Sequence, residues 1–294
     1  MLGLAILGAS VSLLDQCFQE IVRAPMLSIY HKHPSVDELE SLINRGQGPF
    51  DRKESVYAYC LRLMYHHYDD YKAVLASINY EPPSDRSTPI GMLDFGCGPA
   101  TAAFAVADYI SEKYGYVPVL HYAGIDIYPD MLSVAGQFLE VITAGGSRGE
   151  FRLAKTTEDL RPALAIGKLP HQAHTLVSAS YIFSQSLSTE TVRSFAELTS
   201  ETVKNRAPND AWFIGLNIDA AAGGLDDHFR SYQDCCQQQG VLLPPSMGRL
   251  TSSRRYPATL YEGKFFAGRP SKPGNVCYTG GRIIVETQPC NSAS

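Results

Sequence analysis

The sequence predicts an α/β fold, in which a mostly parallel sheet carries helices on both faces and follows an N-terminal helical extension. Two observations indicate this class. Residues 90–107, IGMLDFGCGPATAAFAVA, combine a short apolar strand, a tight glycine loop and an apolar run of helical length, as in the first unit of nucleotide-binding α/β folds. Strand and helix patterns then alternate up to residue 218, as parallel strands with right-handed crossovers require.

The glycine loop favours a ligand that lies against bare backbone. Gly96 and Gly98 lack a Cβ atom and can adopt positive φ, and the unpaired N–H groups of the following helix can point at the ligand. The dinucleotide fingerprint requires a further glycine, but its position is occupied by Thr101, and the lysine of a Walker loop is missing too. An acid, Asp94, stands two residues before the first glycine. An ordinary turn after a strand remains an alternative.

Two motifs carry a family resemblance. The first reads LDFGCGPAT, and the second reads YAGIDIYPDML over residues 122–132. The pair resembles class I S-adenosylmethionine-dependent methyltransferases, with Ala100 where many members carry a third glycine. The resemblance implies the cofactor S-adenosyl-L-methionine, with Asp126, 28 residues after Gly98, holding the two ribose hydroxyls. Asp126 and Pro129 could instead form only a helix cap and first turn.

The resemblance also implies a wider cofactor site at the ends of the first four strands. Its expected members are Asp94, Gly96, Cys97, Gly98, Ala100, Asp126, Ile127, Thr157 and Ser180. In this family the stretch after the third strand often contacts the adenine, which suggests Thr157 or Glu158. Glu158 and Asp159 are equally suited to the first turn of a helix. Cys97 is interpreted as a small loop residue rather than a nucleophile.

The reaction centre is expected after the fourth strand, in the stretch VSASYIFSQS. Tyr181 is the residue expected to face the methyl group, and His228 is the second predicted catalytic residue, although it could simply face solvent at a helix start. A sulfonium makes its methyl group electrophilic, so alignment and exclusion of water supply most of the catalysis. A base is needed only where the nucleophile must lose a proton. The (N/D)-P-P-(Y/F) motif of nucleobase and glutamine methyltransferases is missing.

The composition fits one large domain with a substantial extension. The chain has 294 residues, 45% of them hydrophobic and 19% charged, and a net charge of −5, which argues against global disorder and broad nucleic-acid binding. Its seven cysteines are odd in number and form no C-x-x-C pair, so neither a disulfide framework nor a zinc site is expected. A reducing, cytoplasmic location follows. The apolar run 1–14 is too short to span a membrane, and we expect a packed helix there.

The extension is expected to cover residues 1–88 and to form the substrate cover. Ser35 begins a capping-box-like helix start, and residues 51–78 carry a wide apolar stripe at helical spacing. This second helix is rich in tyrosine, which suits either a lid over the substrate or plain helix packing. His66 and His67 lie within it as candidate bases, but no third ligand suggests a metal site.

The domain that follows, residues 89–287, is expected to contain alternating strands and helices. The expected strands are 90–95, 119–127, 150–154, 174–180 and 211–218, and the expected helices are 101–113, 129–143, 158–166, 190–205 and 226–239. The resemblance implies a seven-stranded, Rossmann-like sheet closed by an antiparallel hairpin, which we assign to residues 259–266 and 275–286. Residues 288–294 are expected to form a flexible tail.

The leading hypothesis is a methyltransferase that acts on a small-molecule or protein acceptor by in-line displacement. One alternative is a catalytically weak or inactive methyltransferase-like subunit that serves binding or assembly. The other is an RNA methyltransferase with a local basic patch at Arg249, Arg254 and Arg255. The acceptor and the oligomeric state stay open.

Overall fold

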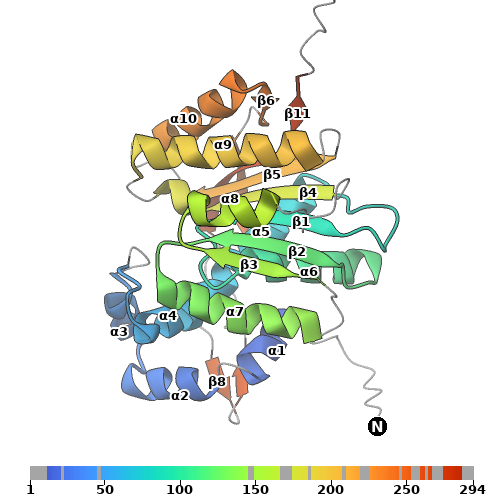
Figure 1. The fold of residues 1–294 in the computed structure, drawn as a ribbon. Coiled ribbons are helices and arrows are strands. Elements are labelled where there is room, and N and C mark those ends of the chain that lie inside the picture. Colours follow the sequence, from blue (N-terminus) through green and yellow to red (C-terminus); the bar gives the residue numbers. More distant parts are fainter. Residues whose placement is uncertain are drawn as a thin grey trace, which may run out of the picture.

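The fold is built on a seven-stranded sheet (Figure 1), with strand order β3-β2-β1-β4-β5-β10-β7. The computed structural model describes residues 12–20, 23–44, 48–144, 149–165, 174–184, 187–206, 210–218, 225–244, 247–252, 259–261, 264–266 and 274–286. Five strands run parallel: β1 (Ile90–Phe95), β2 (Leu120–Ile125), β3 (Phe151–Ala154), β4 (His174–Ser180) and β5 (Ala211–Ile218). The strands β10 (Gly274–Arg282) and β7 (Met247–Ser252) complete it in antiparallel pairing. The predicted fold class is confirmed.

Helices cover both faces of the sheet and create two cores (Figure 1). The sheet helices are α6 (Thr101–Tyr114), α7 (Pro129–Ala144), α8 (Thr157–Ala165), α9 (Thr189–Arg206) and α10 (Leu225–Gln238). Alternate residues of each strand point to opposite faces. In β1, Met92 therefore joins the core under α6 and α7, whereas Leu93 joins the core under α8, α9 and α10.

The strand order reverses beside β1, because β2 lies on one side of it and β4 on the other. The connection after β1 runs to α6 on one face of the sheet, and the connection after β4 runs to α9 on the other face. A crevice therefore opens between the two loops at the carboxyl ends of these strands. In open α/β sheets this switch point is where ligands bind. The glycine loop after β1 and the segment after β4 both lie there.

The extension consists of helices packed on the α6 and α7 side. They are α1 (Leu13–Glu20), α2 (Arg23–Lys32), α3 (Val36–Leu42), α4 (Lys53–Tyr59) and α5 (Tyr65–Ser77). A π-helical segment, η2 (Cys60–Met64), joins α4 to α5, so the predicted helix 51–78 is present but carries a widened turn. The capping box is present too: the Glu38 N–H donates to the Ser35 hydroxyl, and the Ser35 N–H donates to the Glu38 carboxylate.

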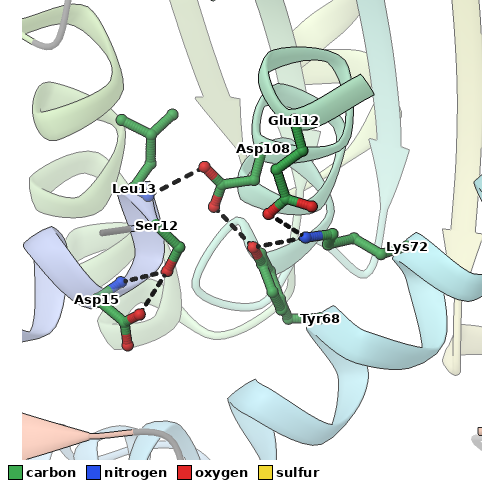
Figure 2. Close-up of polar contacts among 7 residues, drawn as sticks. All are labelled: Ser12, Leu13, Asp15, Tyr68, Lys72, Asp108 and Glu112. Atoms are coloured by element: carbon green, nitrogen blue, oxygen red, sulfur yellow. Dashed lines mark hydrogen bonds and ion pairs between the residues drawn. The ribbon is translucent and has the colours of Figure 1, made fainter. Parts of the chain in front are cut away.

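Asp108 of α6 attaches two extension helices to the sheet layer (Figure 2). Its Oδ1 accepts the Leu13 N–H at 3.0 Å, and its Oδ2 accepts the Tyr68 hydroxyl at 2.8 Å. Lys72 lies 3.4 Å from the Tyr68 hydroxyl and 2.5 Å from Glu112. Burial raises the pKa of Asp108, and the bonds from Leu13 and Tyr68 oppose that rise. The carboxylate thus fixes α1 and α5 to the helix that follows the glycine loop.

The closing strand pair differs from the prediction. The sheet partner of β10 is β7, whereas the predicted segment 259–266 forms a separate hairpin from β8 (Thr259–Tyr261) and β9 (Lys264–Phe266). The reason lies at Gly248: a Cβ atom there would come within 2.6 Å of the Tyr278 ring, so glycine admits β7 to this edge. A further pair joins β6 (Val241–Leu242) to β11 (Ile284–Val285).

Three predictions fall wholly or partly outside the described residues. They are the tail 288–294, most of the apolar run 1–14 and the arginines at 254 and 255. Among the helices that the structure describes, none combines the length and apolar character needed to cross a bilayer.

Candidate functional site

The glycine loop turns sharply at the end of β1. Gly96 has φ +66° and Gly98 has φ +51°, both in the left-handed region that favours glycine. A Cβ atom on Gly96 would lie 2.8 Å from the side chain of Ile182, which follows β4. A Cβ atom on Gly98 would meet nothing within 4 Å. Gly96 therefore permits close packing of two loops, while Gly98 presents bare backbone to open space.

Ala100 ends the loop in the same left-handed region, with φ +61°. Its N–H donates to the Cys97 carbonyl at 2.9 Å, and α6 begins at the next residue. A residue with a Cβ atom is strained in this conformation. The backbone here thus has the form that a third glycine would adopt most readily.

Asp126 follows β2 and its carboxylate spans two loops. One oxygen accepts the Gly98 N–H at 3.0 Å and the other accepts the Tyr128 N–H at 3.0 Å. Burial raises the pKa of this carboxyl to about 6, although both backbone bonds act to lower it. Each oxygen keeps a lone pair that can accept a ligand hydroxyl.

A cavity of about 510 Å³ opens beside Asp126 and the glycine loop. Six of the predicted site residues line it: Gly96, Gly98, Asp126, Ile127, Ser180 and Tyr181. Ile127 is 70% exposed, an unusual position for a large apolar side chain, and with Met131 it gives the cavity an apolar wall. A carboxylate beside an apolar wall suits a ligand with hydroxyls at one end and a flat apolar ring at the other.

The other predicted residues lie elsewhere. Asp94 and Cys97 line a second, smaller cavity beside the first. Ala100 is buried in the loop, and Thr157 is buried at the start of α8, where its hydroxyl donates to Glu158. His228 lies in α10 and lines neither cavity.

Asp94 and Cys97 are buried side chains at the back of the loop. The Tyr122 hydroxyl donates to Asp94 Oδ2 at 2.6 Å. Burial raises the pKa of Asp94 to about 6, against the lowering effects of Tyr122 and Ser178. Burial also raises the pKa of the Cys97 thiol well above its usual value, which keeps it protonated and a poor nucleophile.

Tyr181 is clamped by residues of α5. It has φ +62°, and its hydroxyl donates to Asp70 Oδ2 at 2.6 Å. Its ring stacks on that of His67, with centroids 4.0 Å apart and planes 25° apart. His66 Nε2 lies 3.0 Å from the same Asp70 oxygen. The hydroxyl of Tyr181 thus points at a buried carboxylate, and its ring forms the cavity wall.

The extension contributes wall residues that were not among the predicted cofactor or catalytic site residues, although His67 was a candidate base. Asn44, Phe50, Tyr59 and His67 line the large cavity. The Tyr59 hydroxyl lies 2.6 Å from His67 Nδ1, across the π-helical segment. The tyrosine-rich pattern of residues 51–78 was the signal for this wall, whereas Asn44 and Phe50 gave none.

Chemistry at this site depends on shape and hydrogen bonding. Within the described residues, no three histidine, cysteine, aspartate or glutamate side chains gather closely enough to hold a metal ion. The described walls of both cavities contain neither lysine nor arginine. The site therefore presents carboxylates and aromatic rings to its ligand, without a fixed lysine or arginine charge.

Comparisons with known proteins give structural similarity at low identity. No protein-family model and no curated protein matches the chain. Similar solved structures include the magnesium protoporphyrin IX methyltransferase of Synechocystis with bound SAH (S-adenosylhomocysteine), at 11% identity and TM-score 0.41 over 90% of this chain and 100% of that one. A putative class I S-adenosylmethionine-dependent methyltransferase from Listeria monocytogenes has 13% identity and TM-score 0.41 over 87% and 71%. The fibrillarin pre-rRNA processing protein of Methanococcus jannaschii has 11% identity and TM-score 0.39 over 75% and 78%. With TM-scores below 0.5, these similarities leave the function to be judged from the site itself.

Proposed function

We propose that this protein is an S-adenosylmethionine-dependent methyltransferase whose cofactor occupies the 510 Å³ cavity. The observation that carries the proposal is the position of Asp126. Its carboxylate stands at the cavity edge, held by the N–H groups of Gly98 and Tyr128, with lone pairs left for two vicinal hydroxyls.

The remaining walls fit the rest of such a cofactor. Ile127 and Met131 offer an apolar surface for the purine, and Gly98 leaves the backbone accessible. The volume falls within the range of about 300–1,000 Å³ that small-molecule sites occupy. The cofactor, when bound, supplies an electrophilic methyl group on a sulfonium.

The acceptor would enter on the extension side of the cavity. Tyr59, His67 and Tyr181 form an aromatic wall beside Ser180 at the end of β4. We infer that this wall aligns the acceptor and excludes water, and that the bond to Asp70 fixes the Tyr181 ring for this task. Residues 1–88 would thus act as the substrate cover of the domain 89–287. We favour a small-molecule or protein acceptor because the described parts of both cavity walls lack the lysines and arginines that phosphate backbones attract.

A second candidate function is a binding or assembly subunit that retains the cofactor fold. One observation favours it: the Tyr181 hydroxyl is engaged by Asp70 and does not point at the reaction centre. The RNA hypothesis rests on Arg249, which is exposed in β7, and on two arginines outside the described residues. We also retain a cytoplasmic location, because the six cysteines of the described part have free thiols, as is typical of reducing compartments.

Transfer of a labelled methyl group tests the proposal. The protein and methyl-labelled S-adenosylmethionine are incubated in three separate reactions, with extracted small molecules, with proteins or with RNA. We expect label in the small-molecule or protein fraction, and less of it with an Asp126→Asn variant. Label confined to RNA would support the RNA alternative, and no transfer despite cofactor binding would support the assembly subunit.

A further inference from the structure

A chain of five aromatic rings follows the extension side of the large cavity. In order of contact, the rings belong to Tyr128, Phe50, Tyr59, His67 and Tyr181, and all five residues line the cavity. Neighbouring ring centroids along this chain lie 5.5, 5.4, 5.6 and 4.0 Å apart. Three of the residues belong to the extension, and the other two follow β2 and β4. Together these five residues form the aromatic belt.

The aromatic belt turns sharply at Phe50. The plane of the Phe50 ring is inclined by 78° to that of Tyr59 and by 86° to that of Tyr128. The rings of Tyr59 and His67 are inclined by 60°. A flat ligand stacks on ring faces that lie parallel, whereas planes that adjoin at such angles surround a compact group. The belt therefore fits a rounded group better than another flat ring.

The charges around the aromatic belt favour a cation. Ring faces carry partial negative charge and attract ammonium groups that lie within about 6 Å of the ring centre. Asp126 lines the same cavity, whose described wall contains no lysine or arginine. The fully buried carboxyl of Asp70 accepts the Tyr181 hydroxyl at 2.6 Å, a bond that makes this ring more electron-rich. A cation would thus be attracted by both the rings and the carboxylate, and an anion would be repelled by both.

We propose that the aromatic belt binds an ammonium group of the methyl acceptor. The inference rests on the proposed function and narrows its substrate class to small molecules or proteins that carry a compact alkylammonium group. The ribose and the purine are assigned to Asp126, Ile127 and Met131, so the belt is left for the acceptor. Phe50 and Tyr128 become specificity-determining residues, because their rings form the sharpest turn of the belt.

Two probes of the same shape test the preference for charge. Choline carries a trimethylammonium group, and 3,3-dimethylbutan-1-ol has carbon in place of the nitrogen and no charge. Each is titrated into protein saturated with S-adenosylhomocysteine. We expect choline to bind about 5- to 30-fold more tightly than the alcohol, as is typical of a cation held by aromatic rings.

Phe50→Leu and Tyr128→Leu each remove one ring and keep an apolar side chain. Either variant should lower the advantage of choline over the alcohol by about 3-fold or more, because part of the attraction to the rings is lost. Phe138→Leu is the matched control, since Phe138 is fully buried against Phe18 and Phe104 and lines neither cavity. It should keep the preference of the wild type. Thermal unfolding shows which variants are folded, and the two belt variants lie on different segments, so either one suffices.

The outcomes separate the aromatic belt from the proposed function. Equal binding of choline and the alcohol to wild-type protein that binds S-adenosylhomocysteine would overturn the belt alone. So would an unchanged preference in a folded belt variant. If choline does not bind and the belt variants weaken S-adenosylmethionine but not S-adenosylhomocysteine, the rings hold the sulfonium of the cofactor, which also overturns the assignment to the acceptor. Failure of the wild type to bind S-adenosylhomocysteine would overturn the proposed function and the inference with it.

Discussion

Replacing Asp126 by asparagine separates ligand binding from folding. The carboxylate joins two loops through the Gly98 and Tyr128 N–H groups, and its half-buried position raises its pKa to about 6, against an ordinary value of 3.8. Asparagine keeps the shape and removes the charge. The variant therefore tests whether the charge serves the fold or the ligand.

The structure gives the expected magnitudes. The rise in pKa means that the ionised carboxylate lowers the free energy of unfolding by about 3 kcal/mol at neutral pH. The amide relieves this cost but has one acceptor oxygen, so one of the two N–H bonds is lost, at about 1–2 kcal/mol. The ligand-free variant should thus be as stable as the wild type or more stable by about 1–2 kcal/mol. Ligand hydroxyls lose a charged acceptor worth about 1.5–3 kcal/mol, which weakens binding about 10- to 150-fold.

Urea unfolding without ligand and titration with S-adenosylhomocysteine measure the two effects. Asp159→Asn is the control, because Asp159 is an exposed acid in the first turn of α8 and lines neither cavity. Unchanged affinity in a folded Asp126→Asn protein would refute the ribose role. A large loss of stability would show instead that this carboxylate is mainly structural.

Three further predictions follow from the same geometry. Burial holds the pKa values of Asp94 and Asp126 near 6, above their unfolded values, so the folded protein takes up protons before the unfolded chain as the pH falls from 7 toward 4. Over this window the unfolding free energy should rise while the affinity for S-adenosylhomocysteine falls. Urea unfolding and titration measure the two quantities, and a reversed or missing trend in either would contradict the prediction. Gly96→Ala should lower the unfolding free energy by about 1–3 kcal/mol, because it adds left-handed strain and a clash at 2.8 Å. Gly98→Ala adds the same kind of strain but meets no atom, so it should cost less stability and weaken the ligand more; equal effects of the two variants in urea unfolding and titration would contradict this contrast. Asp108→Ala should cost about 2 kcal/mol and speed proteolysis of the first helix, because it removes the carboxylate that accepts the Leu13 N–H and the Tyr68 hydroxyl; an unchanged cleavage rate would show that α1 is held by other contacts.

The parts of the fold that could be predicted are those fixed by local chemistry. Gly96 and Gly98 stand where the backbone needs positive φ, and the strand before them begins with an apolar run because both of its faces are buried. The acid after the second strand could be placed near the loop because parallel strands end at one edge of the sheet. These features require no knowledge of how distant segments dock.

The rest depends on tertiary packing. Phe50 and Tyr59 reach the cavity only because the extension docks on α6 and α7, through contacts such as those of Asp108. The edge strand β7 was missed because six residues with a glycine and an arginine carry a weak strand pattern. Its place is decided by the fit of Gly248 under Tyr278, which joins segments 30 residues apart.

Titration of S-adenosylhomocysteine into wild-type protein stripped of copurified ligand tests whether the 510 Å³ cavity binds this cofactor. We expect one site per chain with micromolar affinity, which weakens below pH 6 as the carboxylates of Asp94 and Asp126 take up protons. Absence of binding at neutral pH, in protein shown to be folded, would contradict the assignment of the 510 Å³ cavity to this cofactor.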